Sequence, residues 1–156
     1  MLKLARETLS TFTVVTTLAA DMKDLSAVGD QTVDMYVSTF ALHHLTNPEK
    51  LTALREARRI LKPHGAIAIA DEVISNRQLP ADPGALLRRV AEMFYPSSSF
   101  EEVESTLRDL KEYPTGLEEM NDICSAAGFK IDWIVYCDIA ALCCGTATDD
   151  PQGLCA

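Results

Sequence analysis

The sequence has no glycine-rich loop after any strand-like segment and no G-x-S-x-G motif. It therefore lacks the phosphate cradle of a kinase and the nucleophile elbow of an α/β-hydrolase. Basic residues are also few, since 14 Lys and Arg stand against 23 Asp and Glu and give a formal net charge of -9. A field of this sign repels phosphate backbones, so we expect no nucleic-acid partner.

Long apolar runs are missing as well. None reaches the ~20 residues that cross a bilayer, because Asp138 interrupts the longest candidate, residues 131–144. Lys3 precedes an apolar segment, as in a targeting peptide, but Glu7 and the five threonines within residues 1–20 argue against one. We expect no membrane span.

The five cysteines are odd in number and include no C-x-x-C pair, which is not the pattern of a disulfide framework. The adjacent Cys143 and Cys144 allow two interpretations: a redox or metal feature or, favoured by their apolar surroundings, two small buried side chains. A reducing compartment, and hence the cytoplasm, is the expected location.

The chain is large enough for one domain with its own core, with 156 residues of which 47% are hydrophobic. Helical spacing of apolar residues predicts a helix over residues 2–9, and β-branched residues predict a strand over 12–20. Residues 32–38 predict a second strand of the continuous apolar type, which is expected in a parallel sheet covered on both faces.

Residues 46–65 carry the signals of a complete helix, with a capping box at Thr46 and Glu49, a proline in the first turn and a closing proline and glycine. The apolar run 66–70 follows as a short strand. Residues 33–70 therefore predict a strand–helix–strand unit whose two strands pair in parallel.

Beyond residue 74 the sequence changes character. Prolines, a glycine and a serine run predict an insertion or cap over residues 74–100. Further helices are expected over 99–113, with Ser99 as the cap, and over 116–128. Two strand-like runs within 129–148 are close enough to pair as an antiparallel hairpin.

The carboxyl ends of the predicted strands carry polar residues. These ends are Asp21-Met22, the segment 38–44 and Asp71-Glu72, each after an apolar run. Ligands of open parallel sheets bind at this edge. We therefore expect a ligand there, with solvent-facing loops as the alternative.

His43 and His44 lie in the second of these segments. Imidazole titrates near neutral pH, so either ring is a candidate general base. The alternative places one histidine in the packing and the other at the surface. No metal site is expected, because adjacent loop residues rarely converge on one ion and no H-x-x-x-H motif accompanies them.

Five segments together resemble class I S-adenosylmethionine-dependent methyltransferases, particularly the small-molecule branch that includes quinone-type C-methyltransferases. They are MLKLARETL, AADMKDLS, VDMYVSTFALHHL, EARRILKPHGAIAIADEV and GLEEMNDICSAAGF. The order and spacing of L-H-H-L, R-x-L-K-P-x-G and the apolar strand after them are the most specific part. The resemblance implies an α/β fold, a three-layer Rossmann-like sheet that ends in an antiparallel hairpin.

The resemblance also implies S-adenosylmethionine as the cofactor. Asp21 matches the acidic residue that hydrogen-bonds the adenine amino group in the family, and Met22 matches its apolar neighbour against the ring. Ser38, Thr39 and Phe40 match the loop that backs the methionyl portion.

Other matches concern the methyl acceptor, for which the resemblance implies a small molecule. His43 and His44 match positions near methyl donor and acceptor, and Asp71 and Glu72 lie at an edge where acceptors approach. Residues 74–113 match the variable region from which relatives build a substrate cover.

The family's front half, with its glycine-rich turn and ribose-binding acid, is not found in this sequence. In the family, two of its strands lie between the counterparts of the predicted strands 12–20 and 32–38. We therefore expect a truncated sheet that is altered or that forms a homo-oligomer through exposed edges.

Two functions remain open from the sequence. The first is methyl transfer by a partial methyltransferase domain, residues 1–148, followed by a polar tail, 149–156. The rival is a catalytically silent relative that serves as an interaction or assembly module. An incomplete gene model, whose longer parent is the working enzyme, would reconcile the two.

Overall fold

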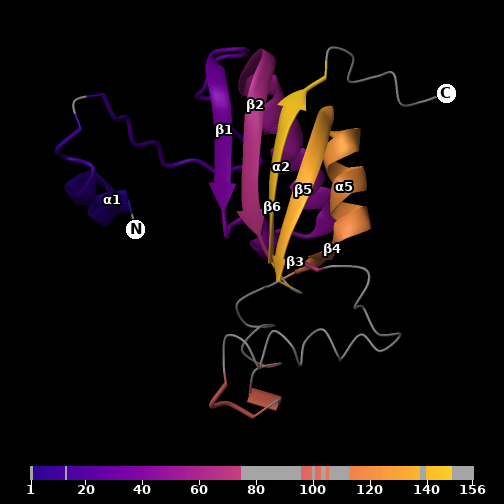
Figure 1. The fold of residues 1–156 in the computed structure, drawn as a ribbon. Helices are drawn as coiled ribbons and strands as arrows, with labels where there is room; N and C mark the ends of the chain where they lie inside the picture. Colours follow the sequence, from indigo (N-terminus) through magenta and orange to yellow (C-terminus); the bar gives the residue numbers. More distant parts are fainter. Residues whose placement is uncertain are drawn as a thin grey trace.

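A computed structural model describes residues 2–12, 14–74, 96–99, 101–102, 105, 113–137 and 140–148, and Figure 1 shows how its elements are arranged. In chain order the elements are α1 (Leu2–Thr8), β1 (Val33–Thr39), the 3-10 turn η1 (Leu42–His44), α2 (Asn47–Ile60), β2 (Leu61–Asp71), β3 (Val73–Ile74), β4 (Thr115–Gly116), α5 (Leu117–Ala126), β5 (Phe129–Cys137) and β6 (Ala140–Ala147).

Four strands form a mixed sheet with the order β1-β2-β6-β5. β1 and β2 pair in parallel, with Tyr36 opposite Ile67 and Ser38 opposite Ile69, whereas β6 runs antiparallel to both of its neighbours. The predicted strand–helix–strand unit and the C-terminal hairpin are therefore confirmed. β3 and β4 form a second, two-stranded parallel sheet.

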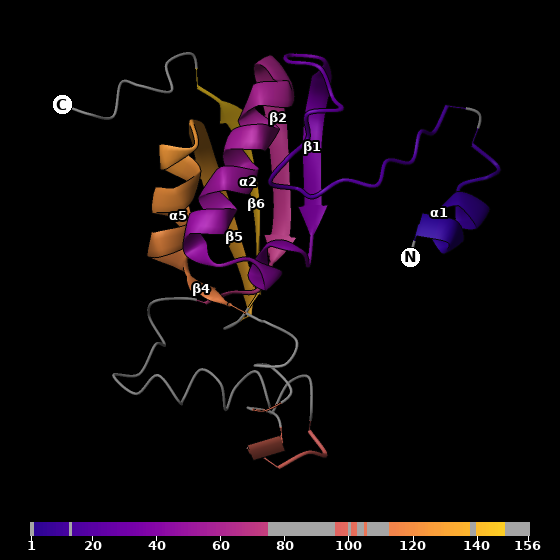
Figure 2. The same cartoon turned by 180° about the vertical axis from the view of Figure 1, so that it is seen from behind.

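Both α2 and α5 cover the same face of the main sheet, as Figure 2 shows from behind. Alternate residues of β2 are buried, including Ile67 and Ile69, and they share one core cluster with Leu54 and Ala57 of α2. Burial of an aliphatic side chain of this size stabilises a fold by about 1.5–3 kcal/mol. The period of two in β2 and the apolar stripe of α2 therefore determine which surfaces meet.

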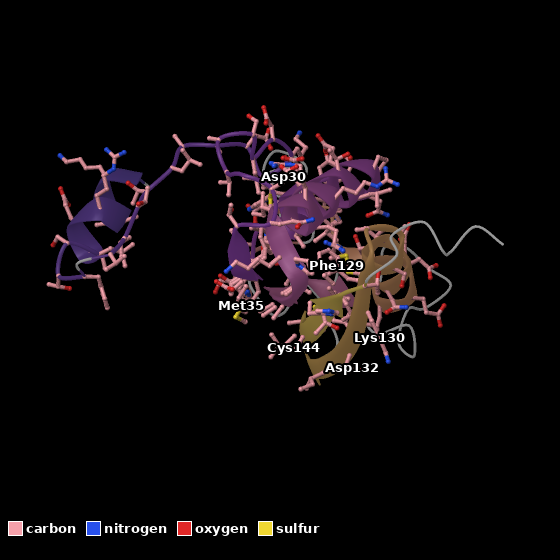
Figure 3. All side chains as sticks on the ribbon, turned by 90° about the horizontal axis from the view of Figure 1, so that it is seen from above. Asp30, Met35, Phe129, Lys130, Asp132 and Cys144 are labelled. Carbon is pink, nitrogen blue, oxygen red and sulfur yellow. The ribbon has the colours of Figure 1, made fainter. Side chains whose placement is uncertain are left out.

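The other face of the sheet is exposed in the part of the chain that the structure describes. Met35 and Val37 of β1 are 52% and 61% exposed, and Ile134 of β5 is 57% exposed. Figure 3 shows Met35 and Cys144 on the side of the sheet away from α2. The prediction that both faces of the sheet are covered is therefore wrong for the described elements, among which β1 is an edge strand.

The strand predicted over residues 12–20 is also wrong. Its described residues form an unpaired stretch that joins α1 to the sheet-bearing part of the fold (Figure 1). β-branched residues favour a strand when a neighbouring strand satisfies their backbone N–H and C=O groups. None of the described strands pairs with this stretch, so composition alone did not produce one.

The predicted helix over residues 46–65 is confirmed at its start and is shorter at its end. Thr46 caps α2, and its N–H and hydroxyl donate to the Glu49 carboxylate at 3.0 and 2.8 Å. The helix ends at Ile60, because Leu61 already pairs with Val33 as the first residue of β2. Sheet pairing thus begins before the proline and glycine that mark a helix end.

Some predictions lie mostly or wholly outside the described residues: the cap over 74–100, the helix over 99–113 and the tail 149–156. The Ser99 cap is an exception, since the Glu102 N–H donates to its hydroxyl at 3.3 Å. The helix predicted over 116–128 is confirmed as α5, and Gly128 follows it with φ 89°. Within the described ranges, no helix has the length and apolarity needed to cross a membrane.

Candidate functional site

The Asp71 carboxylate, at the end of β2, holds the loop that follows β1. Its Oδ2 accepts the N–H groups of Ala41 and Leu42 at 3.0 and 2.7 Å, and its Oδ1 accepts the Glu72 N–H at 2.8 Å. Burial raises the pKa of Asp71, but the His43 side chain and these N–H donors outweigh burial and hold the pKa below its usual value. The buried carboxylate is therefore charged and fixes the loop from within.

The two histidines lie in η1 beside this carboxylate. Nδ1 of His43 lies 2.7 Å from Oδ1 of Asp71, and both side chains are buried. Such a contact fixes the orientation of an imidazole ring. His44 is exposed, and its ring centroid lies 4.1 Å from that of His43 with the planes tilted by 55°. One histidine is thus packed inside and the other faces solvent at the same edge.

Ser38, Thr39 and Phe40 lead from β1 into the histidine turn. Ser38 is buried, and its hydroxyl has no hydrogen-bond partner among the described residues. Thr39 is exposed, and Phe40 is 54% exposed with φ 45°. A bulky residue in this left-handed region costs on the order of 1 kcal/mol or more. The strained backbone holds an aromatic ring toward solvent where the strand ends.

The loop with Asp21 and Met22 is fixed to α2. The Asp21 carboxylate accepts the Lys23 N–H at 2.9 Å, and the Lys23 ammonium donates to Glu49 at 2.7 Å. Hydrogen bonds from Lys23 and Thr46 lower the pKa of Glu49 to about 2. Because Glu49 lies in the first turn of α2, just after the histidine turn, these contacts bring the exposed Asp21 to the same end of the sheet.

A second group of contacts secures the same loop further along. The Arg59 guanidinium donates to the carbonyls of Leu25 and Val28 at 2.9 and 3.0 Å, and the Glu56 carboxylate accepts the Leu25 N–H at 2.8 Å. Both charged residues belong to α2. The loop is therefore anchored on the helix, without help from the strand predicted before it.

Lys50 is a further group at this edge, and motif reasoning misses it. It is 2% exposed, and its ammonium donates to the carbonyls of Leu45 and Tyr113 at 2.8 and 2.6 Å and to Asn47 Oδ1 at 3.3 Å. Burial is the main cause that lowers the pKa of Lys50 to about 8. Its position in the sequence could have predicted its burial, because Lys50 lies at helical spacing from the buried residues of α2.

Comparison with known proteins finds methyltransferases that resemble part of this chain. Residues 1–69 match the model described as Methyltransferase domain. An uncharacterized methyltransferase of Bacillus licheniformis is 34% identical over 98 residues, which cover 63% of this chain and 41% of that protein. The resemblance to class I S-adenosylmethionine-dependent methyltransferases is therefore confirmed. It spans about two fifths of the length of the curated methyltransferases it matches.

Solved structures share the fold. The YcgJ protein of Bacillus subtilis superposes with a TM-score of 0.69 at 16% identity, over 96% of this chain and 79% of that one. A structure of PigF with SAH gives a TM-score of 0.62 at 17% identity, over 94% of this chain and 40% of that one. At such identities the likeness shows the fold alone, and it confirms the Rossmann-like α/β class.

The methyltransferase match covers β1, η1, α2 and most of β2. It therefore includes Asp21, the segment 38–40 and both histidines, and it ends just before Asp71. The structure places the segment 38–40, the histidines and Asp71 together, with the Asp21 loop joined to them through Lys23 and Glu49.

Proposed function

We propose that the chain binds S-adenosylmethionine at the carboxyl ends of β1 and β2 and supports methyl transfer to a small-molecule acceptor. The observation that carries the proposal is the Asp71 carboxylate, which holds the loop after β1 and the histidine turn at one sheet edge. The match of residues 1–69 to the methyltransferase domain model supports the choice of cofactor, as does a structural neighbour that contains SAH.

The side chains at this edge fit the chemistry of the cofactor. The exposed Asp21 carboxylate suits the adenine amino group, and the half-buried Met22 offers apolar surface to the ring. The buried Ser38 hydroxyl, without a partner among the described residues, and the exposed Thr39 and Phe40 suit the methionyl portion. When bound, S-adenosylmethionine supplies a methyl group activated by its sulfonium.

The chain's own residues would orient the acceptor and remove a proton where an O–H or N–H must lose one. We assign the proton-accepting role to His44, because its ring is exposed at the edge. We assign an orienting role to His43, because it is buried with Nδ1 on Asp71 and its ring lies against that of His44.

A second proposal, an assembly module, is favoured by the exposed sheet face. Met35 and Val37 offer apolar side chains on an edge strand of the described sheet. Unpaired strand edges recruit strands from other chains. Under this proposal the chain pairs with a second copy through β1 and does not need the cofactor.

Isothermal titration calorimetry of the purified chain with S-adenosylmethionine and S-adenosylhomocysteine tests the first proposal. Saturable micromolar binding that is lost in Asp21→Ala and kept in Asp34→Ala supports a cofactor site. Asp34 is a matched control, because its carboxylate is also exposed but lies near the opposite end of β1, paired with Lys62. Absence of binding at millimolar ligand contradicts the proposal for this chain and favours the assembly module.

A further inference from the structure

The segment before the Asp21 loop stands apart from the sheet. We call residues 2–20 the arm, which comprises α1 and the unpaired stretch that follows it (Figures 1 and 2). Its described residues hydrogen-bond only with one another, as where Arg6 Nε donates to the Thr17 hydroxyl at 2.6 Å. Phe12 is 64% exposed and Val14 93% exposed. The apolar side chains of the arm are therefore left to solvent.

The stretch that follows α1 has the alternation of a strand with one apolar face. Positions 12, 14, 16 and 18 hold Phe12, Val14, a threonine and Leu18, whereas the odd positions from 11 to 17 hold three threonines and Val15. Successive side chains of a strand point to opposite faces. As a strand, this stretch would place Phe12, Val14 and Leu18 on one side and mostly hydroxyl groups on the other.

The edge strand β1 offers what this stretch lacks. It has β2 on one side and no described strand on the other. The Phe40 N–H donates to the Ala70 carbonyl of β2 at 2.8 Å, and N–H groups alternate in direction along a strand, so that of Val37 points away from β2. Val37 and Met35 are also exposed on the open face of the sheet. An added strand would therefore find both hydrogen-bonding groups and apolar neighbours here.

The direction of the arm favours a second copy of the chain over its own β1. The loop that follows the arm is fixed on α2, where Lys23 donates to Glu49 at 2.7 Å and Arg59 to the Leu25 carbonyl at 2.9 Å. From this anchored loop the arm leads away from β1 of its own copy (Figures 1 and 2). A segment that points outward in this way is suited to exchange between two identical chains.

Charge also favours a contact between the arm and another copy. Residues 1–20 contain two basic side chains and one acidic side chain, a net charge of +1. The other 136 residues contain 12 basic and 22 acidic side chains, a net charge of -10. Two such acidic bodies repel each other, whereas the arm is attracted to the body of the other copy.

We propose that two copies of the chain exchange arms, so that residues 12–18 of each copy add a strand to the β1 edge of the other. The apolar side chains of the arm then extend the open face at Met35 and Val37. This inference rests on the assembly proposal above and names the two segments that form the contact. It explains why a stretch with the composition of a strand has no strand partner within one copy.

Sedimentation velocity of the full chain over a concentration series tests the exchange. We expect Val14→Lys and Val37→Lys each to raise the dimer dissociation constant at least about tenfold, because a symmetric dimer contains the altered contact twice. Val15→Lys is the matched control, since it adds the same charge to the same stretch on the opposite face, and it should change the constant less than about twofold. Val14 and Val37 are exposed in the single copy, so circular dichroism should show an unchanged fold.

The double variant Val14→Lys/Val37→Lys shows whether the two residues share one contact. In exchanged arms, residue 14 of one copy and residue 37 of the other belong to the same contact, so the double variant should lose less affinity than the two single losses combined. Losses that add fully mean separate contacts and overturn the exchange. Equal losses in Val14→Lys and Val15→Lys also overturn it.

The remaining outcomes separate this inference from the proposals above. Weakening by Val37→Lys without weakening by Val14→Lys means that β1 edges pair with each other, which keeps the assembly module and overturns the exchange. Weakening by Val14→Lys alone means contact between arms and also overturns it. A monomer at all concentrations overturns the assembly module and the exchange together. Calorimetry judges the cofactor site separately, because sedimentation needs no ligand.

Discussion

Replacement of Asp71 by asparagine should destabilise the fold more than any other single isosteric change at the site. Asp71 is 2% exposed. Its Oδ2 accepts two backbone N–H groups, from Ala41 and Leu42, and its Oδ1 accepts the Glu72 N–H and faces His43 Nδ1. In either orientation, the amide nitrogen of asparagine would face N–H groups from which it cannot accept a hydrogen bond.

The magnitude follows from the donors left unsatisfied. In one orientation, the asparagine amide would leave the Ala41 and Leu42 N–H groups without an acceptor, and in the other orientation it would do the same to the backbone N–H groups of Glu72 and His43. A buried unsatisfied donor costs about 1–3 kcal/mol. Two such donors give an expected loss of about 2–6 kcal/mol in the free energy of unfolding of Asp71→Asn at neutral pH, a large part of the ~5–15 kcal/mol typical of a domain.

Urea unfolding monitored by circular dichroism, at neutral and acidic pH, measures this loss. The pKa of Asp71 is lowered in the folded state, so its stabilisation is present above the unfolded value near 4 and is lost as the pH falls through the folded pKa. The difference in free energy of unfolding between Asp71→Asn and the unmodified chain should therefore become smaller at acidic pH. Asp34→Asn, at an exposed ion pair with Lys62, should change the free energy by less than about 1 kcal/mol.

A loss below about 1 kcal/mol in Asp71→Asn at neutral pH, equal to that of Asp34→Asn, would refute the reasoning. It would mean that solvent or backbone movement satisfies the loop donors without the carboxylate. A large loss that does not vary with pH would show that the shape of Asp71 matters and its charge does not.

Three further predictions concern the sheet. Gly145→Ala should lower the free energy of unfolding by about 1–3 kcal/mol in urea titrations, because a Cβ there would lie 2.5 Å from the Lys130 carbonyl oxygen; unchanged stability would contradict this packing. Maleimide labelling mapped by mass spectrometry should modify Cys144, which is exposed, well before Cys124, which is buried and whose pKa burial raises; equal rates would contradict the described core. Sedimentation velocity over a concentration series should detect self-association of the chain that Val37→Lys weakens, since Val37 is exposed on the edge strand; a monomer at all concentrations would remove the assembly proposal.

Local signals in the sequence predict α2, β2 and α5 because each signal acts on its own neighbours. The capping residues of α2 lie three positions apart and meet within one helical turn. The alternation of alanine and isoleucine in residues 66–70 and the glycine that follows α5 also act only on residues close by in the sequence. The family resemblance added the cofactor-site residues, and the parallel unit followed from the helix that lies between its two strands.

The predictions that failed concern structure that depends on contacts with distant parts of the chain. Other features of this kind were not predicted at all. Residues 12–20 have the composition of a strand, but a strand exists only where another strand accepts its hydrogen bonds, and the described sheet offers none. Whether both faces of β1 are covered likewise depends on other elements of the fold. Among the described elements none covers the face that carries the exposed Met35 and Val37.

By itself, then, the sequence determined the methyltransferase-type α/β unit and the edge at which polar residues gather. Only the tertiary structure decided which of these residues work together. Asp71 lies 29 positions from Leu42, and Lys50 lies 63 positions from Tyr113. Burial makes the first pair a charged clamp and the second a desolvated ammonium that joins α2 to the backbone of Tyr113, because both depend on distances and desolvation that no local pattern records.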